Sequence, residues 1–401
     1  MSPLDAYRPP QFSADIDLDL SRNEGRPWPL SDSAFAIDLD AVSRYPETTP
    51  FRLAVAARHG IDSDRVLLTA GGDDALGRCF ASRAGATAVT TTPGFEMIGR
   101  YSRQTGGTVV EVDWWDGDFP VAEFLDAARS ASMAVIVSPN NPTGGVVTEA
   151  GLRKVADVFP FVVLDAAYAD FADEDLTDAA LAMSNVVVVR TLSKAFGLAG
   201  LRVGYLLGSP DAIAELSAFG SPYPVSGLSS HLAEAALAAD RTARRAYIDG
   251  ILEGRRRLTR ALRDLGAEPL PSQGNFVLAT DVDPGWLVPA AASLGVGLRE
   301  FPDRPNLTRC VRITVPRDPD ELDRLLTTLR AVLAPEGLIF DLDGVIADVS
   351  GSYREAIIAT AAHFGVVVDQ SDVGAAKVEG TANDDWELTR RLCLASGVEV
   401  S

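Results

Sequence analysis

The sequence of 401 residues is poor in cysteine and in positive charge, and it contains no long apolar run. Its three cysteines lie far apart without a Cys-x-x-Cys pair, which argues against a disulfide framework and against a structural zinc site. With 36 Lys and Arg against 56 Asp and Glu, the net charge of −20 disfavours nucleic acid and anionic membranes as partners. No apolar stretch reaches the roughly 18 residues of a membrane span, and the first residues lack a signal core. We therefore expect an acidic, cytoplasmic protein of several domains.

Seven short apolar runs alternate with amphipathic stretches between about residues 60 and 210. They show little polar alternation, which is typical of strands buried on both faces, so we predict a mostly parallel, seven-stranded α/β sheet. The expected strands are 66–69, 87–92, 109–114, 133–139, 161–168, 185–192 and 203–208. Residues 229–264 have helical spacing and no proline, which predicts one helical stretch. A smaller α/β segment follows, with strands at 275–280, 296–301 and 310–315 and a helix from Asp318 to about Leu333.

These patterns divide the chain into four segments. Residues 1–40 are rich in proline and have no core pattern, so we expect them to pack as an arm on the small domain. The large domain is expected at 41–264 and the small domain at 265–334. The pattern restarts at 335–401, with an expected strand at 337–350 and a helix at 352–365, and this last segment is too short for a complete α/β domain.

Candidate site residues gather at the C-terminal ends of the expected strands, where open α/β sheets bind their ligands. In chain order they are Gly72, Asp73, Phe95, Asn141, Asp165, Tyr168, Thr191, Ser193, Lys194 and Arg202. Each has an ordinary explanation by itself: a lysine after a strand is usually solvated, an aspartate often caps a helix, and Asn-Asn-Pro-Thr-Gly favours a turn. These explanations do not account for the order in which the residues follow successive strands.

One cofactor, pyridoxal 5′-phosphate (PLP), accounts for the whole set. The amine of Lys194 can bond covalently to its aldehyde, and the carboxylate of Asp165 can keep its ring nitrogen protonated. Asn141 and Tyr168 can contact the ring 3-oxygen, while Phe95 offers a face for stacking on the ring. The predicted phosphate site consists of Gly72, Asp73, Thr191, Ser193 and Arg202.

Three blocks of sequence resemble the fold-type I aminotransferases, most closely the histidinol-phosphate subgroup. They are SPNNPTG at 138–144, DAAY at 165–168 and RTLSKAFGLAGLRVGY at 190–205, and weaker likenesses extend the match to roughly 15–333. Two positions depart from the family pattern. Ala166 stands where the family usually has glutamate, and Phe95 stands where it usually has tyrosine.

The resemblance implies a fold-type I PLP-transferase that forms a homodimer with a shared active site. Tyr45 is then expected to reach the PLP phosphate of the neighbouring subunit. Arg312 is expected to bind a substrate carboxylate or phosphate through its planar fork, because that fork suits a bidentate anion. Arg299 and the segment around Asn23 complete the expected substrate pocket.

The implied reaction moves an amino group from a small-molecule donor, glutamate, to a keto acceptor. Lys194 is expected to move the proton as a general acid and base. Imidazole-acetol phosphate is the usual acceptor of the subgroup, whereas aromatic keto acids, or decarboxylation of a phosphorylated amino acid, remain alternatives. A PLP-binding regulator without turnover is a further alternative, but the sequence shows no DNA-binding module.

The segment FDLDGV at 340–345 resembles motif I of the haloacid-dehalogenase-type (HAD) phosphatases. There, Asp341 would attack phosphorus and Asp343 would act as acid and base, with Mg²⁺ neutralising the phosphate. An acidic turn is the alternative reading of Asp-x-Asp-Gly. Because the later motifs of that family are not recognisable after residue 350, we expect an incomplete HAD-like segment without phosphatase activity. No metal is expected in the aminotransferase site.

Overall fold

The computed structural model describes residues 9–25, 43–239, 241–335, 337, 353–378 and 385–399. Internal contacts divide the chain into two compact units, and the boundary falls between Ala334 and Pro335. Each unit is described by itself. None of the helices in the described parts of the chain combines the length and the apolar composition of a membrane span.

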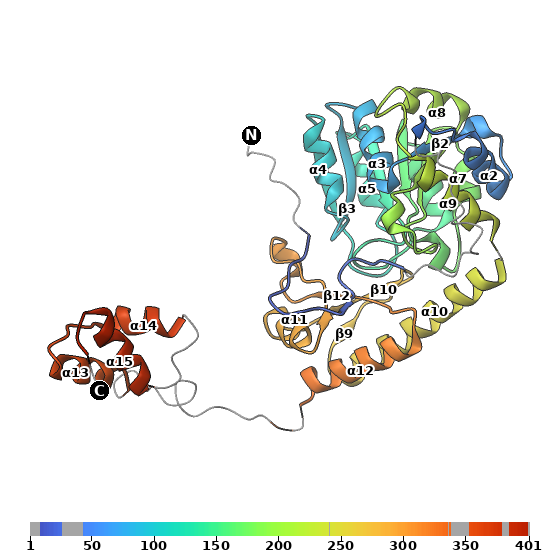
Figure 1. The fold of residues 1–401 in the computed structure, drawn as a ribbon. Helices are drawn as coiled ribbons and strands as arrows, with labels where there is room; N and C mark the ends of the chain where they lie inside the picture. Colours follow the sequence, from blue (N-terminus) through green and yellow to red (C-terminus); the bar gives the residue numbers. More distant parts are fainter. Residues whose placement is uncertain are drawn as a thin grey trace. The chain divides into compact units, whose positions relative to one another are not determined.

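A seven-stranded sheet forms the centre of the first unit (Figure 1). Its spatial order is β2-β8-β7-β6-β5-β3-β4. The strands are β2 (Val66–Thr69), β3 (Thr87–Thr92), β4 (Thr108–Asp113), β5 (Met133–Val137), β6 (Phe161–Asp165), β7 (Val186–Thr191) and β8 (Gly204–Leu207). Strand β8 runs antiparallel to its neighbours β2 and β7, while the other pairs are parallel. The predicted, mainly parallel α/β sheet is therefore confirmed.

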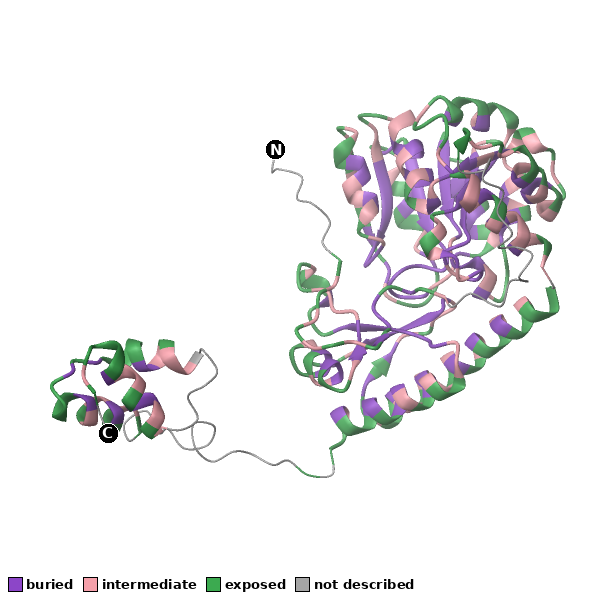
Figure 2. Cartoon of the chain, viewed as in Figure 1, coloured by how far each residue is buried: buried purple, intermediate pink, exposed green. Residues whose placement is uncertain are grey.

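The central strands are buried because helices cover both faces of the sheet (Figure 2). Successive side chains of a strand point to opposite faces. Accordingly, Val135 packs in one apolar cluster together with side chains of α3, α4 and α8, and Ile136 packs in the other with side chains of α2 and α6. The helices of this part are α2 (Thr49–His59), α3 (Gly71–Ser82), α4 (Met97–Gln104), α5 (Val121–Ala127), α6 (Glu149–Ala156), α7 (Thr177–Leu181) and α8 (Pro210–Ser217).

The helical stretch expected at 229–264 forms two helices, so the prediction of one continuous helix is wrong. Helix α9 (Gly227–Ala238) ends at Ala239, whose ψ of 165° is extended, and α10 (Arg241–Asp264) follows. The two helices pack on different partners, because α9 contacts α2 whereas α10 contacts β10 and α12. Helical periodicity alone carries no sign of this change of partner.

The second part of this unit contains a small antiparallel sheet, in the order β12-β10-β9. Its strands are β9 (Glu268–Pro269), β10 (Phe276–Thr280) and β12 (Val311–Thr314), accompanied by α11 (Pro284–Ser293) and α12 (Pro319–Leu333). The expected strand at 296–301 is reduced to β11 (Val296–Gly297) and a single bridge between Arg299 and Arg312. Strand β1 (Leu18–Asp19), from the N-terminal part of the chain, pairs in parallel with β11.

The second unit contains α13 (Glu355–His363), α14 (Gln370–Val378) and α15 (Asp385–Ala395). A small apolar cluster that includes Ile357, Val373 and Leu388 holds these helices together. The expected helix at 352–365 is present as α13. The expected strand at 337–350 carries Asp341 and Asp343, which lie outside the described residues.

Candidate active site

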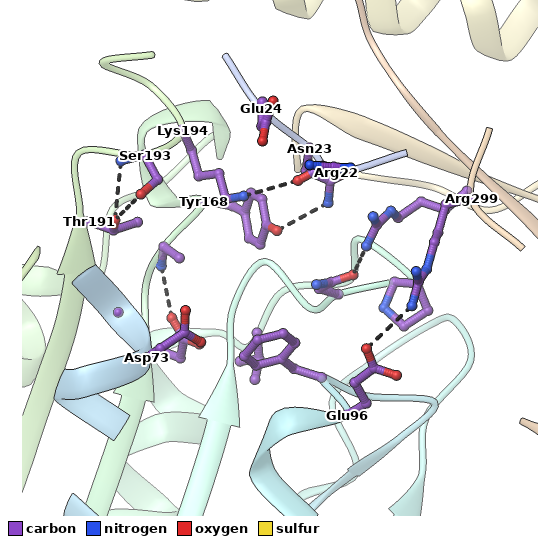
Figure 3. Close-up of a pocket in the computed structure, with 18 of the residues that line it drawn as sticks. Arg22, Asn23, Glu24, Asp73, Glu96, Tyr168, Thr191, Ser193, Lys194 and Arg299 are labelled. Atoms are coloured by element: carbon purple, nitrogen blue, oxygen red, sulfur yellow. Dashed lines mark hydrogen bonds and ion pairs between the residues drawn. The ribbon is translucent and has the colours of Figure 1, made fainter. Parts of the chain in front are cut away.

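A pocket of about 380 Å³ opens at the carboxyl ends of the parallel strands (Figure 3). Its walls also include residues 21–24 of the N-terminal part and the loop after β11. All but one of the site residues predicted for the aminotransferase line it. They are Asn23, Gly72, Asp73, Phe95, Asn141, Asp165, Tyr168, Thr191, Ser193, Lys194, Arg202, Arg299 and Arg312. Residues that lie far apart along the chain, from Asn23 to Arg312, therefore meet in one cavity.

Asp165 ends β6 and is buried beneath the pocket. The backbone N–H of Ala167 donates to its Oδ1 over 3.1 Å. Burial raises the pKa of the Asp165 carboxyl to about 6, a nearby Asp73 pushes it in the same direction, and Lys194 opposes the rise. The site therefore holds an acid in surroundings that disfavour its charge, and a cationic partner would stabilise that charge.

Lys194 lies in the loop that follows β7, and its amine points into the pocket (Figure 3). Nζ donates to the carbonyl oxygen of Arg22 over 3.4 Å and lies 5.6 Å from the ring centroid of Tyr168. The Tyr168 hydroxyl accepts a hydrogen bond of 3.1 Å from Nδ2 of Asn23. The N-terminal segment thus contacts both the lysine and the tyrosine that the sequence predicts to act on the cofactor.

Hydroxyl and guanidinium groups gather at the end of the pocket next to α3. Thr191 Oγ1 and Ser193 Oγ are 2.9 Å apart, and the backbone N–H of Ser193 donates to Thr191 Oγ1 over 3.1 Å. Nη2 of Arg202 donates to Oδ2 of Asp73 over 3.1 Å. Together with the first turn of α3, these groups supply donors of the kind that bind a phosphate.

Helix α3 starts with two glycines, of which Gly72 lines the pocket and Gly71 packs closely against Arg202. Gly71 has a φ of 82°, a conformation that residues with a side chain rarely adopt. A Cβ atom there would lie 3.0 Å from Nη2 of Arg202. The donor groups, the glycine turn, the buried acid and the lysine all fit the phosphate, ring nitrogen and aldehyde of PLP.

Two arginines approach the pocket from the small sheet. Arg312 is buried, and it donates through Nη1 to Oδ1 of Asn141 over 2.6 Å and through Nη2 to the carbonyl oxygen of Ser21 over 2.7 Å. Arg299 donates through Nη2 to Oε1 of Glu96 over 3.3 Å. The two arginines therefore differ in how firmly the protein itself holds them.

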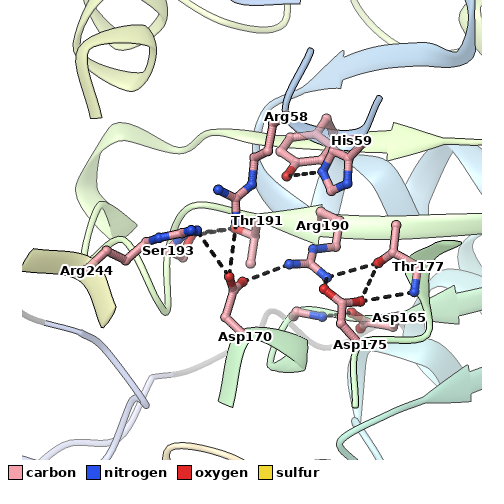
Figure 4. A network of polar contacts seen from close by, with 12 residues as sticks. Arg58, His59, Asp165, Asp170, Asp175, Thr177, Arg190, Thr191, Ser193 and Arg244 are labelled. Carbon is pink, nitrogen blue, oxygen red and sulfur yellow. Dashed lines mark hydrogen bonds and ion pairs between the residues drawn. The ribbon is translucent and has the colours of Figure 1, made fainter. Parts of the chain in front are cut away.

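A network of charged side chains surrounds the buried Arg190, next in the chain to the segments that carry Tyr168 and Lys194 (Figure 4). Arg190 donates to Asp170 over 2.8 Å and to Asp175 over 2.7 Å. Arg58 and Arg244 also pair with Asp170, at 3.3 and 3.5 Å. Because Asp170 follows Tyr168 by two residues and Arg190 precedes Lys194 by four, this network fixes the two loops against each other.

Tyr45 is the predicted cofactor residue that does not line the pocket. Its side chain is 79% exposed, and its ring stacks on that of Tyr223 with centroids 4.5 Å apart. The assignment of Tyr45 to the PLP phosphate of a neighbouring subunit therefore stays a prediction.

The structure adds pocket residues that the sequence did not indicate. Glu96 and Arg304 line the pocket, together with the ring of Phe301. Glu96 directly follows the predicted Phe95, so its position in the same loop could have drawn attention to it. Arg304 lies in a loop without a recognisable motif, and no sequence signal pointed to it.

Comparison with known proteins identifies the family. Residues 33–329 match the family model described as aminotransferase class I and II. A histidinol-phosphate aminotransferase of Nostoc sp. is 31% identical over 338 residues, which cover 81% of this chain and 94% of that protein. The crystal structure of the histidinol-phosphate aminotransferase of Sinorhizobium meliloti, in complex with pyridoxal-5′-phosphate, has a TM-score of 0.71. It is 27% identical and covers 80% of this chain and 91% of its own.

The fold is also shared with an L-threonine-O-3-phosphate decarboxylase from Porphyromonas gingivalis. That structure is 22% identical, has a TM-score of 0.67, and covers 79% of this chain and 99% of its own, so the likeness concerns the fold alone. The matches confirm the predicted enzyme class, an aminotransferase that uses PLP. By sequence and by fold, the chain belongs to the class I and II aminotransferase family.

Proposed function

We propose that this enzyme transfers an amino group from glutamate to imidazole-acetol phosphate, which yields histidinol phosphate. The observation that carries the proposal is that Lys194 and Asp165 line the same pocket as Arg299 and Arg312. Lysine and buried aspartate supply the transfer chemistry, and the two guanidinium groups suit an anionic acceptor. Two relatives of about 30% identity, each matched over 94% of its own length, carry the name of this activity.

When bound, PLP supplies a ring that accepts electrons from the α-carbon of the substrate. Lys194 would hold it covalently, and Asp165 would face its ring nitrogen. A carboxyl with a pKa of about 6 is already ionised near neutral pH, and a positive partner would lower that pKa further. Gly72, Asp73, Thr191, Ser193 and Arg202 would hold the phosphate.

Asn141 and Tyr168 would bind the ring 3-oxygen of PLP. Because the amide oxygen of Asn141 accepts from Arg312, its NH₂ group is the part that can donate to a ligand. The hydroxyl of Tyr168 accepts from Asn23, so its own proton is directed away from that side chain. Both side chains can thus donate to an anionic oxygen.

The Lys194 amine would move the protons of the reaction. Its Nζ would take the α-proton of the amino donor and later return a proton to the α-carbon of the acceptor. Asp165 would supply the negative charge that balances the protonated ring nitrogen. Arg312, fixed by its bonds to Asn141 and Ser21, would orient the substrate, and Arg299 and Asn23 would border its tail.

Replacing Lys194 with alanine tests the proposal. We expect the purified variant to lack the visible absorbance of the lysine-bound cofactor and to lose at least about 10³-fold in turnover. The exposed Lys154 offers a matched control, since its replacement with alanine removes the same side chain far from the pocket. Full activity of the Lys194→Ala variant would refute the assigned role.

A panel of amino donors then tests the substrate. Conversion of histidinol phosphate in the reverse half-reaction supports the proposal. Conversion of aromatic amino acids alone, or release of CO₂ from a phosphorylated amino acid, would instead favour one of the two alternatives.

We further propose a cytoplasmic homodimer that places Tyr45 of one subunit at the active site of the other. The exposure of Tyr45 beside Tyr223 supports this, because two stacked rings on a monomer surface are suited to burial by a partner. For residues 335–401 we keep the proposal of a relation to the HAD phosphatases, which rests on the motif at 340–345.

A further inference from the structure

One wall of the pocket carries an ion pair that the reaction does not require. Oε1 of Glu96 lies 3.3 Å from Nη2 of Arg299, and the side chains of Glu96 and Arg299 are 37% and 15% exposed (Figure 3). Both residues line the pocket. Arg299 is also one of the two arginines expected to bind the anionic group of a substrate. The carboxylate of Glu96 therefore competes with that anionic group for the Arg299 guanidinium.

The two partners are held in place from opposite sides of the pocket. Glu96 directly precedes α4, where the helix N-terminus favours a carboxylate. The backbone of Arg299 exchanges two hydrogen bonds, of 3.1 and 2.9 Å, with that of Arg312. In addition, Nη1 of Arg304 donates to the carbonyl oxygen of Gly94 over 3.4 Å, which links the small-sheet side to the loop that carries Glu96.

The contact between Glu96 and Arg299 can be exchanged, whereas those of Arg312 are fixed. Arg312 is buried and makes two bonds of 2.6 and 2.7 Å to the protein. The pair at Arg299 has one longer hydrogen bond and remains partly open to solvent, so a ligand anion can replace the carboxylate at a moderate cost.

The pair has opposite consequences for charged and uncharged substrate tails. An anionic tail must displace Glu96 before it reaches Arg299, and the displaced carboxylate then repels it. An uncharged substrate side chain leaves the Glu96–Arg299 pair intact. It then covers a guanidinium whose charge is already neutralised, and avoids the free-energy cost of burying an unpaired charge. The rings of Phe95 and Phe301 also line the pocket and offer apolar surface to such a tail.

We propose that Glu96 determines specificity, as a built-in counterion that allows this pocket to accept uncharged aromatic tails as well as anionic ones. The inference rests on the proposed transamination and names a second class of substrate for the same site. It predicts that removal of the carboxylate favours anionic substrates and disfavours aromatic ones. Because the two effects have opposite signs, a general loss of activity cannot imitate them.

The test compares the holoenzyme with its Glu96→Gln variant in the half-reaction with L-glutamate and with L-phenylalanine. The cofactor absorbance reports both reactions. We expect the ratio of kcat/KM for glutamate over phenylalanine to rise about fivefold, the upper range for a partly exposed ion pair. Glu96→Asp, which withdraws the carboxylate by one methylene group, should move the ratio in the same direction by less, and serves if Glu96→Gln does not fold.

The matched control is Glu215→Gln, which removes a carboxylate from an Arg83–Glu215 pair of comparable exposure, 27% and 46%, outside the pocket. Its ratio should equal that of the wild type. In an Arg299→Met background, Glu96→Gln should no longer change the ratio, because the two residues act as a pair.

An unchanged or lowered ratio in Glu96→Gln overturns the inference, and so does an equal rise in the control. Histidinol phosphate is tested in parallel with the wild-type enzyme. If it is not converted, the proposed substrate is wrong, while the ratio of glutamate to phenylalanine still decides the role of Glu96.

Discussion

Replacing Asp165 with asparagine should stabilise the cofactor-free protein while it destroys the activity. The pKa of the buried carboxyl is about 6, compared with 3.8 for the ordinary group, so it is raised by about 2 units. At about 1.4 kcal/mol per unit, keeping Asp165 ionised costs the folded, cofactor-free protein about 3 kcal/mol. Asparagine has nearly the same shape without the charge, and its oxygen can still accept from the N–H of Ala167.

The sign of the pH dependence follows from the raised pKa. The folded protein holds the Asp165 proton more tightly than the unfolded chain does, so ionisation opposes folding. The loss of folding stability caused by ionised Asp165 is absent well below the unfolded pKa of 3.8. It grows as the pH rises from 3.8 to the folded pKa of about 6, and it is complete above the folded pKa. The folded, cofactor-free protein is thus more stable with Asp165 protonated, and it loses this stability as the pH rises through the folded pKa.

Urea unfolding of the cofactor-free proteins measures the effect, because bound cofactor would add its own stabilisation to the wild type. We expect Asp165→Asn to raise the free energy of unfolding by about 3 kcal/mol near pH 8 and by about half of that near pH 5. The control is Asp126→Asn, at an exposed carboxyl that pairs with Arg129, and it should stay within about 0.5 kcal/mol of the wild type.

The activity of the reconstituted Asp165→Asn enzyme should fall by about 10² to 10³-fold, because an amide cannot balance the positive charge of the ring nitrogen. The reasoning is refuted if the variant is no more stable than the wild type near pH 8. It is equally refuted if the gain in stability is the same near pH 5 and near pH 8.

Two further predictions concern the phosphate end of the site. Gly71→Ala should weaken PLP binding to the cofactor-free enzyme and cost about 1–2 kcal/mol of stability, because it forces a φ of 82° on alanine and places Cβ 3.0 Å from Arg202. Reconstitution titrations measure the affinity. The control is Gly77→Ala, on the same helix at a position with open space around it. Equal PLP affinities of the two variants would contradict the proposal that the start of α3 binds the phosphate. Mixing inactive Tyr45→Ala and Lys194→Ala subunits should restore up to about a quarter of the wild-type sites, since each mixed dimer regains one complete site. No recovery after subunit exchange would argue against a shared site.

The strands and the polar residues that follow them were predictable because both depend on local sequence. A strand buried on both faces needs a continuous apolar run, and each of the seven expected runs forms a strand of the large sheet. Parallel strands bring their carboxyl ends to one edge, so Asp165 at the end of β6 and Lys194 shortly after β7 were expected to lie near each other. The predicted site residues around them therefore meet in one pocket, with the exception of Tyr45.

Other features depended on which distant surfaces meet. The break at Ala239 exists because α9 and α10 pack on different partners, and helical spacing is the same on both sides of it. Glu96 and Arg299 are separated by 203 positions in the chain, so nothing in either local sequence indicates that they pair. The same holds for Arg58 and Arg244, which meet at Asp170 from two different helices.

The amino-acid sequence alone was enough to predict the α/β architecture and the cofactor, and to propose the lysine that would bind it, because apolar runs and strand-end residues act within a few positions of the chain. The pairing of Glu96 with Arg299 inside the pocket, on which the proposed specificity rests, became visible only in the folded chain. A charge pair depends on the distance between two side chains in space, and the folded backbone sets that distance.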